Sequence, residues 1–355
     1  MRNILITGGA GFVGSNLACL WTRDFPEDQV TAFDNLKRRG SELSLLRLKE
    51  CGIRFVHGDI RNREDLESLG DVDLIFECSA EPSVQAGYQG SPRYLINTNL
   101  SGTLNCLEFA REREAQFFFL STSRVYPIPL LRSLPLEKNE ERFYLPSGKK
   151  GAGWSTNGIA EDFPLDGIRS LYGATKLSSE LFVQEYAAAF GMNTIIDRCG
   201  VLTGPWQMGR VDQGFVSLWA SRFLYGGRLR YMGFEGQQVR DILHISDLHD
   251  LLKIQVRDIP RYSGKVFNVG GGAGNSISLR ELSRLCSFFS KASLKVDFSP
   301  ITHPTDIPYY VSDNSRIMSE TGWSPRKSIE NILEEIFRWL RDYRPQLEGL
   351  FTDPP

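Results

Sequence analysis

NILITGGAGFVGSNLACLWTR, at residues 3–23, is the stretch that decides the fold. Its apolar opening predicts a short buried strand, its last nine residues predict a helix, and a glycine-rich loop joins the two. Gly8, Gly11 and Gly14 lie in that loop with the spacing G-x-x-G-x-x-G. Glycines there allow a tight turn and let the backbone approach a pyrophosphate, whose charge the helix N-terminus favours. The stretch therefore predicts a dinucleotide-binding unit; the alternative is a tight turn and nothing more.

An acidic residue supports the dinucleotide interpretation. VTAFD, at residues 30–34, predicts a second strand that ends in Asp34, about 20 residues beyond the glycines as this type of site requires. A carboxylate there accepts hydrogen bonds from the adenosine ribose and repels a 2′-phosphate, which favours NAD over NADP. Lys37, Arg38 and Arg39 follow closely and leave NADP open.

Further apolar runs extend the pattern. They are IRFVHGD, DLIFEC, QFFFLS and NTIIDRC, with helical patterns between them, the longest around 92–113. Strand–helix alternation with continuously apolar strands predicts an α/β fold, a doubly wound parallel sheet covered on both faces. Asp59, at the end of HGDI, is predicted to reach the adenine, although it could be a simple turn-forming aspartate.

Composition excludes several classes of function. Apolar residues make up 41% of the 355, charged residues 24%, and the net charge is −2 without a basic block, so nucleic-acid binding is not indicated. The sequence contains no apolar run of membrane-spanning length, and we expect no secretory signal. Six scattered cysteines lack metal or redox spacing, so we expect a cytoplasmic protein without a metal site.

SLYGATK, at residues 170–176, carries a second candidate site. Tyr172 and Lys176 are four residues apart, so on a helix the phenol and the ammonium share one face. A nearby ammonium favours the phenolate and lowers the tyrosine pKa. The alternative is an ordinary amphipathic helix in which neither residue has a chemical role.

The motifs together resemble one family. TGGAGFVG, FDN, GDI, NTNLSGT, STSRVY, YGATK and VRDILH occur in the order typical of extended short-chain dehydrogenases/reductases and cover almost the whole chain. The resemblance implies a Rossmann-type fold, bound NAD and a catalytic set of Thr122, Tyr172 and Lys176, with Tyr172 as acid/base. It also implies a set of cofactor-binding residues, namely Gly8, Gly11, Phe12, Val13, Gly14, Asp34, Asn35, Asp59, Ile60, Ser79, Ala80, Asn99, Tyr172 and Lys176.

The two residues that follow Thr122 limit the types of reaction that the chain is expected to catalyse. Members that dehydrate nucleotide sugars have an Asp-Glu pair there, which protonates the leaving hydroxyl and removes a carbon-bound proton. This chain has Ser123 and Arg124, so it lacks the groups for elimination of water. Reversible hydride chemistry at one carbinol carbon remains, which means an epimerase or a dehydrogenase.

The carboxyl half resembles the branch that inverts carbon 2 of CDP-hexoses such as CDP-paratose and CDP-tyvelose. The similar segments are 204–219, 237–248, 267–282 and the insert 127–170. We expect an NAD-binding domain over 1–200 with returning segments at about 237–272. A smaller mixed α/β domain, 201–236 and 273–355, would bind the nucleotide-diphosphate sugar.

The resemblance also implies substrate-binding residues, which are Glu81, Ser123, Arg124, Asp212, Gln213, Arg240 and Asp306. Arg240 would contact the pyrophosphate; the alternative is a structural ion pair with Asp241 or a helix end. Asp212 and Gln213 could instead cap a helix, and Glu81 could be a solvated loop residue. His303 stands where many relatives have a phosphate-binding arginine.

These expectations leave other functions open. A UDP-sugar 4-epimerase or a nucleotide-sugar dehydrogenase would share the same core, and a non-catalytic NAD-binding sensor represents a different class. The helices around 92–113 and 172–190 suit the family's dimer interface, so we expect a homodimer, with a tetramer as the alternative.

Overall fold

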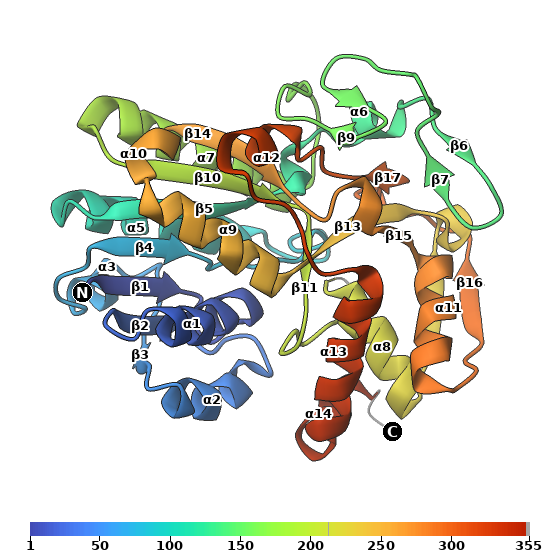
Figure 1. The fold of residues 1–355 in the computed structure, drawn as a ribbon, viewed down its shortest axis with the longest axis horizontal. Coiled ribbons are helices and arrows are strands. Elements are labelled where there is room, and N and C mark those ends of the chain that lie inside the picture. The colour runs from blue at the N-terminus through green and yellow to red at the C-terminus, as the bar shows by residue number, and fades with distance from the viewer. Residues whose placement is uncertain (212, 353–355) are drawn as a thin grey trace. The chain divides into compact units, whose positions relative to one another are not determined.

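The computed structural model describes residues 1–211 and 213–352, and the chain divides into two compact units (Figure 1). The first unit contains Met1–Val125, Leu171–Cys199 and Leu248–Phe267. The second contains Tyr126–Ser170, Gly200–Asp247 and Asn268–Pro355, of which the structure describes the residues up to 352.

A seven-stranded sheet forms the centre of the first unit, in the order β14-β10-β5-β4-β1-β2-β3. Every neighbouring pair from β10 to β3 is parallel. The strands are β1 (Asn3–Thr7), β2 (Gln29–Asp34), β3 (Arg54–His57), β4 (Leu74–Glu77), β5 (Gln116–Thr122), β10 (Thr194–Cys199) and β14 (Lys265–Val269). The strand order reverses between β1 and β4, which is where sheets of this type bind ligands. The predicted doubly wound fold is confirmed.

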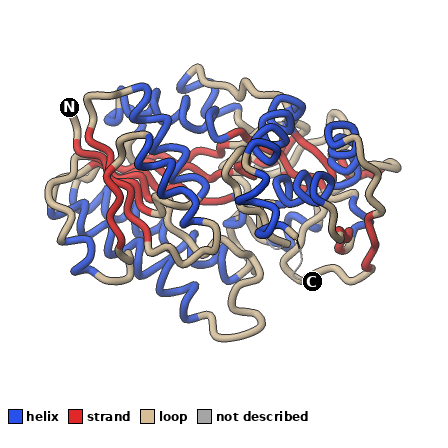
Figure 2. Tube along the Cα trace, turned by 90° about the horizontal axis from the view of Figure 1, so that it is seen from below, coloured by secondary structure: helices blue, strands red, loops and turns tan. Residues whose placement is uncertain are grey.

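Helices lie on both faces of this sheet (Figure 2). They are α1 (Phe12–Asp24), α2 (Ser44–Glu50), α3 (Arg63–Glu67), α4 (Arg93–Ile96), α5 (Gly102–Glu112), α7 (Leu171–Phe190), α9 (Ile245–Arg257) and α10 (Ile259–Tyr262). Phe117 and Phe119 of β5 pack with Leu107 of α5 and Val183 of α7 in one buried apolar cluster. Burial on both faces explains why the strands read as continuous apolar runs.

The helix predicted over 92–113 is interrupted. A π-helical turn at Asn97–Ser101 separates α4 from α5. The Asn99 carbonyl accepts hydrogen bonds from the hydroxyls of Thr103 (2.9 Å) and Ser179 (2.8 Å). Such turns insert one residue into a helix and often occur at functional sites. The side-chain hydroxyls that bind this carbonyl come partly from α7, so periodicity alone did not indicate the interruption.

The second unit is mixed α/β. Its helices are α6 (Ile128–Arg132), α8 (Phe215–Tyr225), α11 (Leu279–Ser290), α12 (Ser315–Thr321), α13 (Ile329–Asp342) and α14 (Arg344–Phe351). Its strands are β6 (Glu137–Lys138), β7 (Phe143–Tyr144), β8 (Trp154–Ser155), β9 (Gly158–Ile159), β11 (Val201–Thr203), β12 (Leu229–Met232), β13 (Val239–His244), β15 (Ser276–Ser278), β16 (Val296–Ser299) and β17 (Tyr309–Tyr310). β13 is the central strand and pairs with β11, β15 and β17.

The division between the units differs from the predicted domain boundaries. Residues 126–170, predicted to lie in the NAD-binding domain, pack within the second unit, as do residues 237–247. The Tyr126 hydroxyl donates to Asn268 Oδ1 at 2.7 Å, and the Ile159 N–H donates to the Val311 carbonyl at 2.8 Å. These contacts join segments that are far apart in the sequence. The single predicted boundary at residue 200 therefore assigned the insert 127–170 to the wrong unit.

A buried acid in β10 gives a test of pH dependence. Asp197 is 1% exposed, and burial raises its pKa to about 7. A hydrogen bond from Gln255 Nε2, at 2.9 Å, acts in the opposite direction but is outweighed. Gln255 Oε1 is buried without a hydrogen-bond partner among the described residues. The folded state therefore binds a proton that the unfolded chain releases near pH 4, so Asp197 costs stability as the pH rises from about 4 to 7.

We expect Asp197→Asn to remove this cost and to supply a donor for Gln255 Oε1. The variant should melt several degrees above the wild type at pH 8 and at about the same temperature at pH 4. Thermal denaturation at both pH values checks this, with the exposed Asp71→Asn as control. Parallel stability curves for Asp197→Asn and wild type would contradict the prediction.

Candidate active site

The glycine loop connects β1 to α1 with a close backbone contact. Gly8 has a φ of +63°, which a glycine adopts without strain. A Cβ on Gly14 would lie 2.3 Å from the Gly8 carbonyl oxygen, so no larger residue fits without moving the loop. Gly11 caps α1 without a side-chain hydrogen bond, and the first turn of α1, which includes Phe12 and Val13, contains no acid. The helix N-terminus is thus built to receive an anion.

Asp34 holds this loop in place. Its carboxylate accepts the N–H groups of Ala10 (3.1 Å) and Leu36 (2.7 Å), which link the end of β2 to the glycine loop. Burial raises the Asp34 pKa, and the hydrogen bonds from Leu36, Ala10 and Gly11 oppose that rise. The carboxylate is where the sequence predicted it, and the structure adds a role in shaping the loop.

Asp59 is held by its neighbours. It forms an ion pair with Arg61 at 2.6 Å and accepts a hydrogen bond from Asn35 Nδ2 at 2.8 Å. Burial acts to raise its pKa, but the hydrogen bonds from Arg61 and Asn35 outweigh burial and lower the pKa to about 2. Ile60, which follows, is buried, and its carbonyl accepts a hydrogen bond from Asn105. Asn35, Asp59 and Ile60 therefore form one locally fixed group; their contact with the adenine stays a prediction.

We expect Asp34→Ala to weaken NAD binding by about 10–150-fold, since a charge-assisted hydrogen bond contributes on the order of 1.5–3 kcal/mol. The preference for NAD over NADP should fall as well. Fluorescence titration with both cofactors measures this. Asp34→Asn is the matched control, because it keeps an acceptor for the loop N–H groups and removes only the charge. If the wild type binds NADP as well as NAD, then Lys37, Arg38 and Arg39 have overridden the carboxylate.

The loop after β4 is fixed by Asn99. Asn99 is fully buried; its Oδ1 accepts the Glu81 N–H at 2.7 Å and its Nδ2 donates to the Glu81 carbonyl at 3.1 Å. Ser79 lies against the glycine loop, since a Cβ on Gly8 would be 3.0 Å from Ser79 Cα. The π-helical turn thus positions residues 79–81, including Ala80, beside the glycine loop.

Thr122, Tyr172 and Lys176 come from the adjacent elements β5 and α7, and all three side chains are buried. Thr122 is the last residue of β5, and the Thr122 hydroxyl forms a hydrogen bond with the Tyr172 hydroxyl. Ser123 and Arg124 follow in a 3-10 turn, where the Arg124 N–H donates to Thr122 Oγ1 at 3.2 Å. The structure therefore brings the predicted catalytic residues together.

The charges around Tyr172 differ from the expectation. Burial raises the pKa of Tyr172 to about 12; the Thr122 hydrogen bond and the Arg124 charge oppose this rise, and Glu77 adds to it. The Lys176 ammonium, which is predicted to lower the Tyr172 pKa, lies 3.8 Å from Glu77 Oε2, so a carboxylate that the sequence analysis did not anticipate is close to it. Tyr172 is a neutral phenol in this arrangement.

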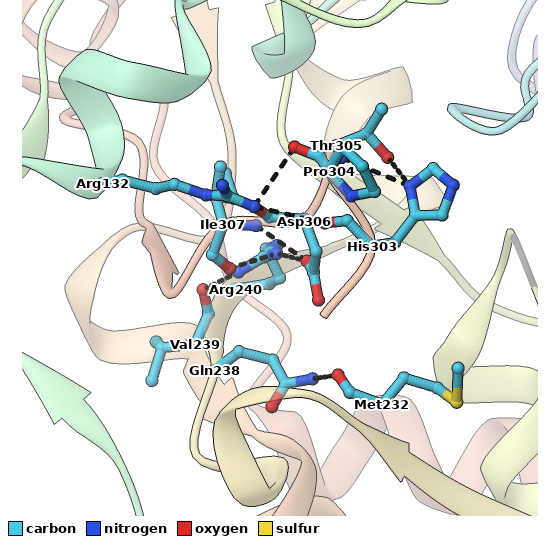
Figure 3. Close-up of polar contacts among 10 residues, drawn as sticks. All are labelled: Arg132, Met232, Gln238, Val239, Arg240, His303, Pro304, Thr305, Asp306 and Ile307. Carbon is cyan, nitrogen blue, oxygen red and sulfur yellow. Dashed lines mark hydrogen bonds and ion pairs between the residues drawn. The ribbon is translucent and has the colours of Figure 1, made fainter. Parts of the chain in front are cut away.

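The second unit contains two of the predicted substrate-binding residues, Arg240 and Asp306 (Figure 3). Arg240, on β13, forms an ion pair with Asp306 Oδ1 at 2.9 Å and donates to the carbonyls of Val239 and Ile307, both at 2.8 Å. An ion pair was considered for Arg240, but with Asp241 as partner. Arg132 of α6 donates to the carbonyls of His303, Pro304 and Asp306 and so fixes the loop that carries Asp306.

Gln213 lies just before α8 and forms a pair of backbone hydrogen bonds with Arg210, at 2.7 and 3.1 Å. Asp212, the neighbouring candidate, lies outside the described residues. Contacts of Gln213, Arg240 and Asp306 with a nucleotide sugar remain predictions.

Two functional candidates escaped the sequence analysis. Glu77 is an acid in the otherwise apolar run LIFEC, at residues 74–78, and that anomaly was a usable signal. Arg132 gave no signal, because its contacts with residues 303–306 join the insert to a segment some 170 positions further along the chain.

The comparison with known proteins agrees with this architecture. A Rossmann-type sheet, a glycine loop and a buried Thr–Tyr–Lys set define an extended short-chain dehydrogenase/reductase. The chain belongs to the NAD dependent epimerase/dehydratase family, whose model matches residues 4–270. The family resemblance and the cofactor expected from the sequence are thereby confirmed, and the protein is an NAD-dependent enzyme.

Individual relatives are similar over nearly their whole length. CDP-paratose 2-epimerase of Salmonella typhi is 30% identical over 95% of this chain and 98% of its own. A dTDP-glucose 4,6-dehydratase of Mycobacterium tuberculosis is 29% identical over 96% of this chain and 93% of its own. The crystal structure of a dTDP-glucose 4,6-dehydratase double mutant from Streptomyces venezuelae with bound NAD superposes with a TM-score of 0.80 at 28% identity, covering 99% of this chain and all of that one.

The residues present fit NAD. The close packing of Gly14 on Gly8 and the uncapped N-terminus of α1 provide a cradle for a pyrophosphate, and Asp34 lies at the end of the next strand. Within residues 1–211 and 213–352, no helix is long and apolar enough to cross a membrane. The same residues contain no group of three or more His, Cys, Asp or Glu side chains that could hold a metal ion.

Proposed function

We propose that this protein is a nucleotide-sugar epimerase that inverts carbon 2 of a CDP-hexose such as CDP-paratose by transient oxidation. The observation that carries the proposal is the combination of Thr122, Tyr172 and Lys176 with Ser123 and Arg124. The acid/base residue is present, and the Asp-Glu pair of a dehydratase is replaced by a hydroxyl and a cation. The full-length similarity to a CDP-paratose 2-epimerase supports the choice of carbon and nucleotide.

The chain's own residues account for the proton movements. Tyr172 takes the proton of the sugar hydroxyl and later returns it, while Thr122 shares the hydrogen bond to that hydroxyl. The Tyr172 pKa of about 12 must fall for this step, and the Arg124 charge acts in that direction. Bound NAD would supply reversible hydride chemistry at the carbinol carbon, so that inversion would involve no net oxidation. Lys176 would hold the nicotinamide ribose.

The second unit supplies candidates for the nucleotide and pyrophosphate. Arg240 is suited to an anion because its planar fork donates several hydrogen bonds. Here Asp306 neutralises it at 2.9 Å, and Arg132 fixes the backbone around Asp306. We propose that a pyrophosphate competes with Asp306 for Arg240, so that phosphate binding depends on the conformation of residues 303–307.

A labelling experiment tests the proposed chemistry. CDP-, UDP-, GDP- and dTDP-hexoses are incubated with the protein in D₂O, and products are examined by NMR and mass spectrometry. We expect inversion at carbon 2 of a CDP-hexose, negligible deuterium at that carbon, retention of a carbon-2 label already in the substrate, and no net formation of NADH.

Each other outcome has a distinct meaning. Deuterium uptake at the inverted carbon would exclude hydride transfer in favour of deprotonation beside a carbonyl. Stoichiometric NADH would make the protein a dehydrogenase. Inversion at carbon 4 of a UDP-sugar would keep the mechanism and refute the proposed substrate, and no turnover of any sugar would favour an NAD-binding sensor.

A homodimer is proposed through the helices around 92–113 and 172–190. Exposed apolar side chains lie on both, with Ile96 37%, Leu181 56% and Phe182 42% exposed. Light scattering on the purified protein distinguishes monomer, dimer and tetramer.

A further inference from the structure

Glu77 is a buried acid in the centre of the main sheet. It ends β4, lies in register with Thr7 of β1 and Phe119 of β5, and is 0% exposed. The Ser79 N–H and the Thr7 hydroxyl act to lower its pKa, but neither carboxylate oxygen receives a hydrogen bond of ordinary geometry from the described residues. An ionised carboxylate is costly in such a place unless a charge compensates it.

Lys176 provides that charge. Its ammonium lies 3.8 Å from Glu77 Oε2 and 3.8 Å from the centre of the Phe119 ring, and its side chain is 3% exposed. The separation is too long for a good hydrogen bond, so the contact is electrostatic and strengthened by burial. An ammonium over a ring face gains further attraction.

Each partner favours the charged form of the other. Burial raises the Glu77 pKa to about 7, and Lys176 opposes that rise. Burial lowers the Lys176 pKa, and Glu77 is the strongest of the charges that oppose the lowering. Removing Glu77 therefore removes the main support of the ammonium.

We propose that Glu77 is a positioning residue that keeps Lys176 protonated and directed at the active site. The proposal rests on the proposed function, because Glu77 acts through the acid/base chemistry of Tyr172 and touches no reacting atom. Other titratable groups act on the pair or on Tyr172 from the surrounding elements, namely Cys78, Cys106, Arg124, Glu180 and Cys199. Glu180 is itself paired with Arg198 at 2.7 Å, so it is partly neutralised.

A thermal double-mutant cycle tests the pair without any substrate. Lys176→Met leaves the Glu77 carboxylate buried without a cation, so we expect a lower melting temperature at pH 8. Adding Glu77→Gln should restore about 5 °C of that loss, because the second substitution removes the uncompensated charge. Melting temperatures that fall additively in the double variant would overturn the proposal.

The pH dependence of turnover tests the positioning role. Direct removal of the Glu77 charge lowers the Tyr172 pKa, whereas loss of the Lys176 proton raises it, so the sign of the shift separates the two effects. We expect the acidic limb of kcat/KM in Glu77→Gln to move up by about one pH unit, a tenfold loss at fixed pH on that limb. Glu77→Asp should recover part of the shift.

Asp197→Asn is the matched control, since it removes another buried carboxylate from the same unit and should leave the limb in place. Reduced turnover of Glu77→Gln without a shift of the acidic limb of kcat/KM, or with a shift of that limb to lower pH, would overturn the proposal. Glu77 would then have only a structural role. The thermal cycle could show that Glu77 and Lys176 interact while the protein turns over no nucleotide sugar. That result would refute both the proposed function and the positioning role, and only the ion pair between the two residues would stand.

Discussion

Tyr172→Phe is expected to lower kcat by about 10²–10⁴-fold, the usual loss when a general acid/base is removed. The ring of Tyr172 is packed in a buried position on α7, so phenylalanine keeps the packing. Only the hydroxyl that contacts Thr122 is lost. Binding of NAD and of the nucleotide sugar, measured by titration, should stay close to wild type. The loss should therefore appear in kcat rather than in KM.

Tyr186→Phe is the matched control for this experiment. Tyr186 lies on the same helix, and its hydroxyl hydrogen bonds to Glu108, away from the predicted catalytic residues. We expect this variant to retain turnover. Near-wild-type turnover by Tyr172→Phe would place the acid/base on another residue.

Gly14→Ala is expected to weaken NAD binding by about 100-fold. The added Cβ would lie 2.3 Å from the Gly8 carbonyl oxygen and 2.8 Å from the Gly8 carbonyl carbon, so the loop backbone has to move. Overpacking of this kind typically costs about 1–3 kcal/mol, and each 1.4 kcal/mol is tenfold in affinity. Calorimetric titration with NAD measures the change.

Gly90→Ala serves as control, because a Cβ at Gly90 meets no atom within 4 Å. Its NAD affinity should equal that of the wild type. If Gly14→Ala binds NAD within about threefold of wild type, the loop adjusts at little cost, and the close contact does not govern the affinity.

Local patterns were enough to predict the NAD-binding part of the fold. β1, β2 and β5 lie within one residue of the predicted runs, because strands buried on both faces must be continuously apolar. Gly14 and Asp34 were found for a related reason. Gly14 contacts Gly8 and Asp34 contacts Ala10, both inside one strand–helix–strand unit, and such short-range contacts can be predicted from the local sequence.

Contacts between distant segments were not predictable in this way. The insert 127–170 was assigned to the NAD-binding domain, and the hydrogen bonds that place it in the second unit reach residues 268 and 311. The π-helical turn at Asn97–Ser101 likewise depends on Ser179 of α7.

By itself the sequence determined the Rossmann-type core and the cofactor, and it predicted the acid/base set, because these depend on residue types at short, regular spacings. The tertiary structure alone decided the charges around that set. Lys176 is four residues from Tyr172 in the sequence, but its ammonium pairs with Glu77 on β4, and burial raises the Tyr172 pKa. The pKa of a buried group depends on which charges and how much water surround it in three dimensions, and no local pattern records these.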